Sequence, residues 1–284
     1  MHAHQAASAI EVSVVMPVGS VDPTLESALD HLDAQIVSFE WELVLALNTK
    51  DPVARRLLEG LVDAHAFDAR IIDASDVRSA SHARNVGANH ARGEKLAFCD
   101  GDDQAEPDWL QQLIDALEPG TAIGGHLGEE ELVVPGQENW RPPATPGNLP
   151  AFLGADYLVS ANMALWAEDF AAVGGFDCDL IRGEDIDFSW RLIESGIELR
   201  YEPTAVMHYR HRAGLRSLLQ QHYLYGRGMA QVLARRPPPG VASSGNRMLQ
   251  ANGQKTENQS VVHVLRRGAI AAGRVRGLLD DRAA

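Results

Sequence analysis

KLAFCDGDD, residues 95–103, joins a short apolar run to a cluster of carboxylates. Residues 96–99 are continuously apolar, which is typical of a strand buried on both faces. Three carboxylates follow within four residues, at Asp100, Asp102 and Asp103. In an open α/β sheet, the carboxyl end of such a strand faces the ligand crevice. A hard divalent cation, which prefers oxygen ligands, would offset the repulsion between these carboxylates, and Gly101 would let the backbone bend around it. A solvated acidic turn is the alternative explanation for this tetrapeptide alone.

Length and composition restrict the class of protein. The 284 residues, 45% of them hydrophobic, suffice for one large α/β domain or for one domain with a tail. The two cysteines, Cys99 and Cys178, are far apart, so we expect neither a disulfide framework nor a zinc cluster. We find no signal peptide and no run of 18 apolar residues, and we therefore expect a soluble, cytoplasmic protein. A net charge of −14 argues against nucleic-acid binding.

Strands and helices alternate over the first part of the chain. Apolar runs predict strands at 12–18, 41–47, 69–73, 96–99 and 121–126. Asp22-Pro23 and Asp51-Pro52 are typical helix starts, and the apolar spacing extends the first helix to Ile36. Further helices are expected at 80–91 and 107–117. This order predicts a Rossmann-like, mostly parallel central sheet flanked by helices. GxGxxG and GxxxxGK are both missing, which removes the dinucleotide and P-loop interpretations.

The second half of the chain is less regular. A loop rich in Pro, Gly and Asn is expected at 135–150, followed by a strand-like segment at 156–164. Helices are predicted at 167–173, 184–195 and 215–234, and a strand at 197–201. We place a boundary at the prolines 237–239, between a main domain (1–236) and an extension (237–284) that consists of a flexible linker and a basic C-terminal helix. The polar residues 241–260 are expected to be disordered.

The C-terminal helix, predicted at 261–279, is amphipathic and basic. Residues 239–284 carry seven Lys/Arg against three Asp/Glu, in contrast to the acidic chain as a whole. Such a helix is suited to a partner protein or to peripheral contact with the inner face of a membrane. Packing back onto its own domain is the alternative.

Four blocks of sequence together resemble a known family. They are VSVVMPV (12–18), ARNVGANHARGEKLAFCDGDD (83–103), GGFDCDLIRGEDIDFSWRL (174–192) and VMHYRHR (206–212). In this order they resemble a family 2 glycosyltransferase with the GT-A fold, over roughly residues 10 to 235. The resemblance implies an inverting, metal-dependent hexosyltransferase that takes a sugar from a nucleotide-diphosphate donor and has its active site in the cytosol.

The resemblance also assigns the metal and donor site. It makes Asp102 of the DxD motif the first choice as ligand of Mn²⁺ or Mg²⁺, with Asp100 contacting the ribose or the metal. A divalent cation there would bridge the two phosphates and stabilise the leaving nucleotide. Gly101, with Pro17 and Val18 at the end of the first strand, would border the donor.

Three more residues are donor-site candidates. The planar guanidinium of Arg84 can pair with a phosphate or a base edge, although an ion pair with a carboxylate is the alternative. Many family members carry an acidic segment after the second strand, whereas this chain has ALNTKD at 46–51. Asn48 and Asp73 are therefore the candidates for contacting the base. A UDP-sugar is the expected donor, with GDP- and dTDP-sugars left open.

The acidic pair before the helix at 184–195 supplies the expected catalytic groups. By the family pattern Asp185 is the general base that deprotonates the acceptor hydroxyl, and Glu184 orients the acceptor. We expect the helix N-terminus to keep both carboxylates ionised. Ordinary helix capping by the pair is the alternative.

Further candidates border these groups. Gly175, Phe176, Arg210 and His211 are assigned to the acceptor side or the diphosphate. Trp190 is grouped with them, although core packing is favoured for its ring. His208 is assigned as an additional metal ligand, with a partly buried structural histidine as the alternative.

Two other functions stay open at this point. One is a nucleotidyltransferase that makes nucleotide sugars, but the loop GSVDPT (19–24) lacks the Arg or Lys that such enzymes usually carry there. The other is a non-catalytic protein that binds nucleotide sugars on the same fold, against which the intact acidic pairs argue. The acceptor, a hydroxyl of a glycan, a lipid-linked molecule or a small natural product, is left open, as is a homodimer.

Overall fold

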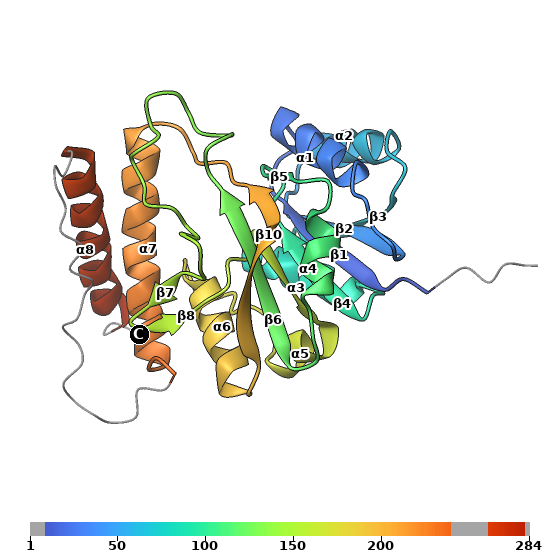
Figure 1. Ribbon diagram of the computed structural model, residues 1–284. Helices are drawn as coiled ribbons and strands as arrows, with labels where there is room; N and C mark the ends of the chain where they lie inside the picture. Colours follow the sequence, from blue (N-terminus) through green and yellow to red (C-terminus); the bar gives the residue numbers. More distant parts are fainter. Residues whose placement is uncertain (1–8, 240–260, 282–284) are drawn as a thin grey trace, which may run out of the picture.

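An eight-stranded sheet forms the centre of the molecule, with helices on both faces and two long helices at one end (Figure 1). The computed structural model describes residues 9–239 and 261–281. The disorder expected at 241–260 therefore falls on residues outside the described ones.

The sheet has the strand order β3-β2-β1-β4-β9-β6-β10-β5. Its strands are β1 (Val12–Val18), β2 (Trp41–Leu47), β3 (Asp68–Asp73), β4 (Lys95–Cys99), β5 (Gln104–Ala105), β6 (Thr121–Gly128), β9 (Asn162–Trp166) and β10 (Glu198–His208). A separate hairpin pairs β7 (Ala151–Phe152) with β8 (Ala155–Asp156). The strands expected in the first half of the chain are all present.

Most of the sheet is parallel, as predicted. The strands β3, β2, β1 and β4 pair in parallel, and so do β6 and β10. The strand β9 is antiparallel to both of its neighbours, β4 and β6, and β5 is antiparallel to β10. Six strands therefore run in one direction and their carboxyl ends lie along one edge of the sheet.

Two predicted strands differ from the observed ones. The segment 156–164 is not one strand, because it contains the end of β8, a connection and the start of β9. The strand expected at 197–201 is the beginning of β10, which continues past a register shift between Glu202 and Val206 to His208. The shift interrupts the apolar pattern that defines a strand in sequence.

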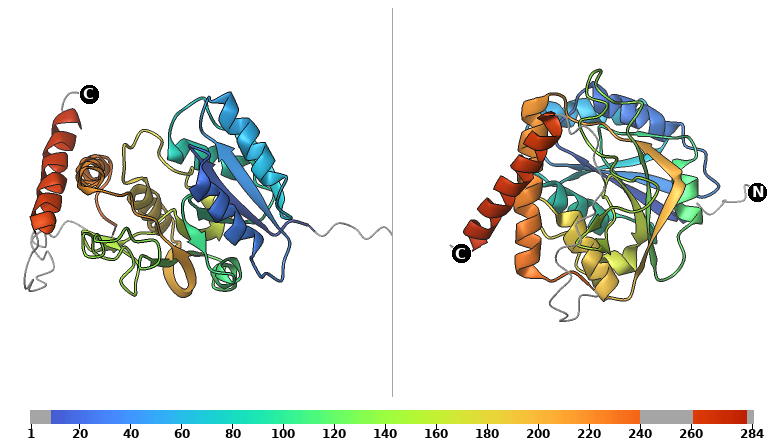
Figure 2. Two further views of the ribbon diagram at one scale, coloured as in Figure 1. Left: turned by 90° about the horizontal axis from the view of Figure 1, so that it is seen from above. Right: turned by 60° about the vertical axis from the view of Figure 1, so that its left-hand side comes forward.

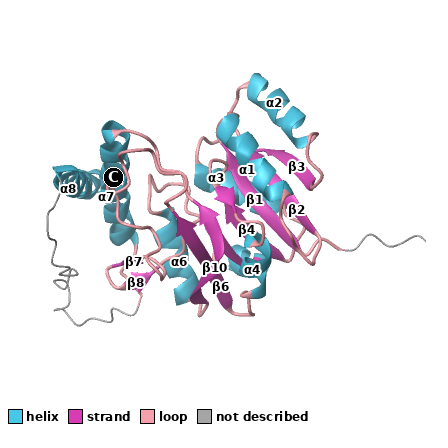
Figure 3. Cartoon of the chain, turned by 45° about the horizontal axis from the view of Figure 1, so that its top comes forward, coloured by secondary structure: helices cyan, strands magenta, loops and turns pink. Residues whose placement is uncertain are grey.

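The helices cover the sheet from both sides (Figure 3). On one face pack α1 (Pro23–Asp33), α2 (Pro52–Val62) and α4 (Trp109–Asp115), against alternate residues of β1 such as Val14 and Met16. The other face holds α3 (Ala80–His90), α5 (Ala167–Ala172) and α6 (Glu184–Glu194), against Val15 and Phe98. The first helix ends at Asp33, so Ile36 does not belong to it, and its side chain is 70% exposed.

Beyond α6 lie α7 (Leu215–Arg235) and α8 (Val261–Asp281). Figure 2 shows α8 as the outermost element, packed along α7 and away from the sheet. The helix thus packs on the main body, the alternative considered for it. The boundary after residue 236 stays a prediction. No helix in the described parts of the chain is long and apolar enough to cross a membrane.

Candidate active site

The three aspartates after β4 form a tight carboxylate cluster. Oxygen atoms of Asp100, Asp102 and Asp103 all lie within 4.8 Å of one another. The chain reverses here from β4 into β5, and this places all three side chains at the carboxyl edge of the sheet. Asp103 is buried, Asp100 is half-buried and Asp102 is the most exposed of the three.

The cluster is electrostatically strained. Partial desolvation, together with the charge of the neighbouring Asp100, raises the pKa of Asp102 to about 6. Burial, with Asp100 and Asp102, also raises the pKa of Asp103 well above its usual range. One oxygen of Asp103 accepts a hydrogen bond from the Arg210 backbone amide at 2.7 Å, while its buried Oδ2 has no partner.

These residues fit a divalent cation. Three carboxylate groups converge, and they repel one another when ionised. A buried oxygen of Asp103 has no hydrogen-bond partner. A hard cation offers what such a set lacks. Arg210 also closes one side, since its Nε donates to the Asp102 carbonyl at 3.0 Å. The structure therefore brings Arg210 beside the aspartates, and its assignment to the acceptor side or the diphosphate stays a prediction.

Arg84, on α3, connects the aspartate cluster to the acidic pair of α6. Its guanidinium is 4% exposed and pairs with Asp100 at 2.5 Å. Burial opposes the charged form, but Asp100, Asp185 and Glu184 outweigh it and raise the pKa of Arg84. The ion pair considered as an alternative is thus present, and Arg84 is the shared counter-ion of two carboxylate groups far apart in sequence.

Glu184 and Asp185 begin α6 directly after Gly183, whose φ of 87° lies in the left-handed region. Burial raises the pKa of Asp185 to about 7, with a further contribution from Glu184. The expectation that the helix N-terminus keeps both carboxylates ionised is therefore wrong for Asp185, because desolvation and the adjacent charge exceed the effect of the helix dipole. The buried Oδ1 of Asp185 has no partner.

Two residues near Asp185 were not predicted. Hydrogen bonds from the side chain and the backbone of Ser160 favour the charged form of the Asp185 carboxylate and so lower its pKa. The hydroxyl of Tyr157 is buried, and burial, together with Asp185, raises its pKa. Both residues lie between β8 and β9, and nothing in their spacing relative to Asp185 could have indicated the contact.

The acceptor-side candidates separate into two groups. Phe176 and Trp190 are 2% and 0% exposed, and Trp190 stacks on Phe152 with ring centroids 5.9 Å apart. The acceptor-side assignment is wrong for these two rings in this structure, because packing leaves them no accessible face. Gly175 is required by α3: a Cβ on it would lie 2.6 Å from Asn85 Oδ1, which accepts from the Phe176 amide at 2.8 Å.

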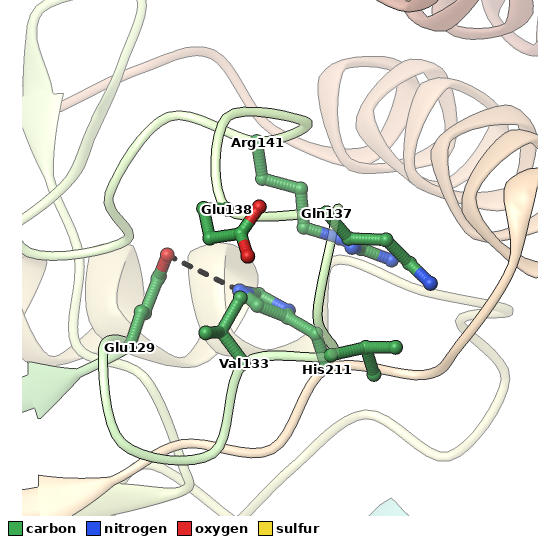
Figure 4. A pocket seen from close by; sticks show the side chains of 7 residues that line it. Glu129, Val133, Gln137, Glu138, Arg141 and His211 are labelled. Carbon is green, nitrogen blue, oxygen red and sulfur yellow. Dashed lines mark ion pairs between the residues drawn. The ribbon is translucent and has the colours of Figure 1, made fainter.

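His211 lies in a small pocket under the 129–150 loop (Figure 4). Its Nε2 is 3.2 Å from Glu129, and Arg141 and Gln137 line the same pocket. The loop contains neither helix nor strand, as expected. Its position over His211 could not be read from the sequence, since 82 residues separate Glu129 from His211.

His208 occupies a group of its own. Its Nε2 is 2.7 Å from Glu106 and 3.7 Å from Glu131, and these three form a cluster distinct from the aspartates. It ends β10, next to β5. Its assignment as a metal ligand stays a prediction, as do the roles of the other candidates.

The donor-side candidates lie at the ends of neighbouring parallel strands. Val18 pairs with Leu47 and Leu47 with Asp73, so Pro17, Asn48 and Asp73 share one edge. Asn48 is buried, and its amide nitrogen donates to the carbonyls of Ala74 and Val77. Asp73 is exposed, and its hydrogen bonds with Ser75 lower its pKa. Asp73 therefore offers an accessible acceptor at this edge, whereas the Asn48 amide group supports the following loop.

The mostly parallel sheet, which ends in an aspartate cluster, has the GT-A fold. The sequence matches the family described as Glycosyl transferase family 2 over residues 13–161. The chain therefore belongs to this family.

Individual relatives agree with the family. The chain is 31% identical over 199 residues to a pre-mycofactocin glycosyltransferase of Mycobacterium tuberculosis, covering 66% of this chain and 42% of that protein. It is 28% identical over 229 residues to the succinoglycan biosynthesis protein ExoM of Rhizobium meliloti, covering 75% and 72%. The chain thus spans about two fifths of the length of the mycobacterial relative.

Two solved structures resemble the fold. A mannosyltransferase of Pyrobaculum calidifontis in complex with GDP-Man and Mn²⁺ has a TM-score of 0.63 at 17% identity, covering 97% of this chain and 78% of that one. TarS of S. aureus, in complex with UDP-GlcNAc, has a TM-score of 0.54 at 17% identity, covering 80% and 71%.

Proposed function

We propose that this protein is an inverting glycosyltransferase that moves a hexosyl unit from a nucleotide-diphosphate sugar, with a UDP-sugar as first choice, to an acceptor hydroxyl. The observation that carries the proposal is the buried Arg84, which pairs with Asp100 at 2.5 Å and whose pKa the charges of Asp185 and Glu184 also raise. A donor-type acidic cluster and a base-type acidic pair therefore belong to one site.

Each group has a role in this proposal. Asp102, with Asp100 and Asp103, would hold Mn²⁺ or Mg²⁺, which when bound neutralises charge on the departing nucleotide. Asp185 removes the proton from the acceptor hydroxyl as the bond to the sugar forms, on the face opposite the leaving nucleotide. A pKa of about 7 suits this task, because such a carboxylate is a stronger base than an ordinary aspartate and about half of it is still ionised at neutral pH.

The nucleotide that the site binds determines which nucleotide sugar is the donor. The structure of the Pyrobaculum mannosyltransferase contains GDP-Man and that of TarS contains UDP-GlcNAc, so the fold accommodates both classes. Asp73 offers an exposed carboxylate for a nucleobase N–H at the end of β3. The proposal includes a cytoplasmic site of action, as the family resemblance implies.

The test combines binding and turnover. Calorimetry with UDP, GDP and dTDP, each with Mn²⁺ and with chelator, should give one nucleotide that binds only with metal. Asp102→Ala should weaken that binding at least about tenfold, a loss of about 1.4 kcal/mol. Asp185→Asn should bind the nucleotide normally. It should cleave the nucleotide sugar about 10²- to 10⁴-fold more slowly, because a general base usually accelerates a reaction by that factor.

Asp179→Asn is the matched control, because Asp179 is an exposed carboxylate just before the same helix. It should leave binding and turnover unchanged. Nucleotide binding that is indifferent to metal would remove the aspartate cluster from the donor site. Full turnover by Asp185→Asn would show that Asp185 is not the general base.

A further inference from the structure

The outer face of α8 is apolar although it points away from the rest of the protein. Val264, Val275 and Leu278 are 57%, 60% and 55% exposed. At 100° per residue they fall within one arc of the helix, which Val261 and Leu279 extend. An amphipathic helix on a globular domain ordinarily turns its apolar arc toward the core. The arc of α8 is therefore unpartnered among the described residues.

The inner face of α8 explains this orientation. A Cβ on Gly273 would lie 1.9 Å from the Tyr223 carbonyl oxygen, and one on Gly277 would lie 2.6 Å from the Arg227 carbonyl oxygen. Across the interface, a Cβ on Gly226 of α7 would lie 2.0 Å from the Ile270 carbonyl oxygen. The two backbones thus approach through glycines, and Val264, Val275 and Leu278 remain on the opposite side of α8. The view from above in Figure 2 shows the open side of α8.

Arginines border the apolar arc on both sides. At 100° per residue, Arg267 and Arg274 flank one edge and Arg276 flanks the other. All three are exposed, and Arg276 also pairs with Asp280 at 2.9 Å. The whole chain carries a net charge of −14, so this basic border contrasts with the rest of the molecule. An anionic surface would repel most of the protein and attract this edge.

We propose that α8 lies in the plane of an anionic lipid membrane, with Val264, Val275 and Leu278 inserted among the acyl chains and the three arginines at the headgroups. The combination of an apolar arc and flanking cations is what an interfacial helix needs, because long arginine side chains reach the phosphates while their stems cover apolar surface. Its 21 residues would extend about 30 Å along the surface.

A second copy of the chain fits this face less well. Two α8 helices that met through the apolar arc would bring the arginines at both edges of each copy close together. Like charges at an interface oppose association. Anionic lipid instead supplies the opposite charge on both sides of the arc at once.

The experiment uses the full-length chain and does not depend on its catalytic function. Sedimentation with vesicles of phosphatidylglycerol and phosphatidylcholine, compared with phosphatidylcholine alone, measures the partition coefficient. We expect binding to the anionic vesicles only, weakened by salt. Val264→Asp/Val275→Asp/Leu278→Asp should lower it at least about tenfold, and so should Arg267→Gln/Arg274→Gln/Arg276→Gln, since each cation near such a surface contributes on the order of 1 kcal/mol, or about fivefold.

Val53→Asp/Leu57→Asp is the matched control, because these side chains of α2 are 48% and 52% exposed and lie on another part of the molecule. It should bind vesicles like the unaltered chain. Circular dichroism confirms that each variant is folded. Equal binding to both vesicle types, or unchanged binding by the folded α8 variants, would overturn the proposal. Dimers that the α8 substitutions dissociate, without any vesicle binding, would overturn it in favour of a second copy.

Discussion

Arg84→Met should destabilise the protein more than any loss of a surface ion pair. The guanidinium is 4% exposed, and its partner Asp100 is 28% exposed at 2.5 Å. Removing one partner of a buried pair typically costs about 3–5 kcal/mol, because the other charge stays behind without compensation. Water can still reach Asp100, so we expect the lower end, about 3 kcal/mol. For a chain of this size that corresponds to a fall in Tm of roughly 6–12 °C.

The loss should also depend on pH. Burial raises the pKa of Asp185 to about 7, although Arg84 acts in the opposite direction. At pH 8 Asp185 is ionised and interacts with Arg84, whereas at pH 5 it is already protonated and that interaction is absent. The free energy of unfolding lost on Arg84→Met should therefore be larger at pH 8 than at pH 5.

Urea unfolding of the metal-free protein at both pH values measures this difference. Arg55→Met is the control, since Arg55 and Glu59 form an i,i+4 pair whose side chains are 45% and 51% exposed. That change should cost less than about 0.5 kcal/mol at either pH. If Arg84→Met cost no more than Arg55→Met at pH 8, Arg84 would not be the shared counter-ion. The same loss at both pH values would exclude its coupling to Asp185.

Two further predictions concern the base and the terminal helix. Because Asp185 must be ionised to accept a proton, turnover at saturating donor and Mn²⁺ should rise about tenfold per pH unit up to about pH 7 and then level off, and a flat profile from pH 5 to 8 would contradict this. Gly273→Ala should destabilise the α7–α8 contact by about 1–3 kcal/mol, because its Cβ has no room. Gly268→Ala, where nothing lies within 4 Å, should instead stabilise α8 by about 0.5–1 kcal/mol. Hydrogen exchange of the α8 amides distinguishes the two variants. Equal protection of α8 in both variants would contradict the tight packing at Gly273.

Local signals in the sequence predicted most of the elements. The two expected helix starts are confirmed in detail: Asp22 accepts a hydrogen bond from Thr24 at 2.9 Å, and Asp51 accepts one from Val53 at 2.9 Å. The strands β1, β2 and β4 are almost entirely buried runs, and a buried strand is readable because nearly every side chain is apolar. These features depend on neighbours within a few residues.

Pairings between distant segments were not predictable in the same way. The antiparallel strand β9 lies between β4 and β6 because of contacts between residues that are far apart in sequence. A local sequence pattern does not report such contacts. The pKa of Asp185 follows from burial and from Glu184 together, and only the first of these needs the fold. The amphipathic pattern of α8 predicted a helix, but the pattern cannot say which face is covered. Gly273 and Gly277 decide that, because their side of α8 is the one that lets the backbone of α7 approach closely.

The charge balance of the site connects metal dependence with the choice of base. Asp100, Glu184 and Asp185 interact with one buried guanidinium, that of Arg84, and Asp102 and Asp103 cluster with Asp100. A nucleotide diphosphate would add further negative charge to this surplus, so it should not bind without a cation that offsets it. Burial, with a further contribution from Glu184, raises the pKa of Asp185 and so makes it a stronger base. On the proposed mechanism, the aspartate cluster beside Arg84 requires a metal, and burial together with Glu184 prepares Asp185 as the proton acceptor.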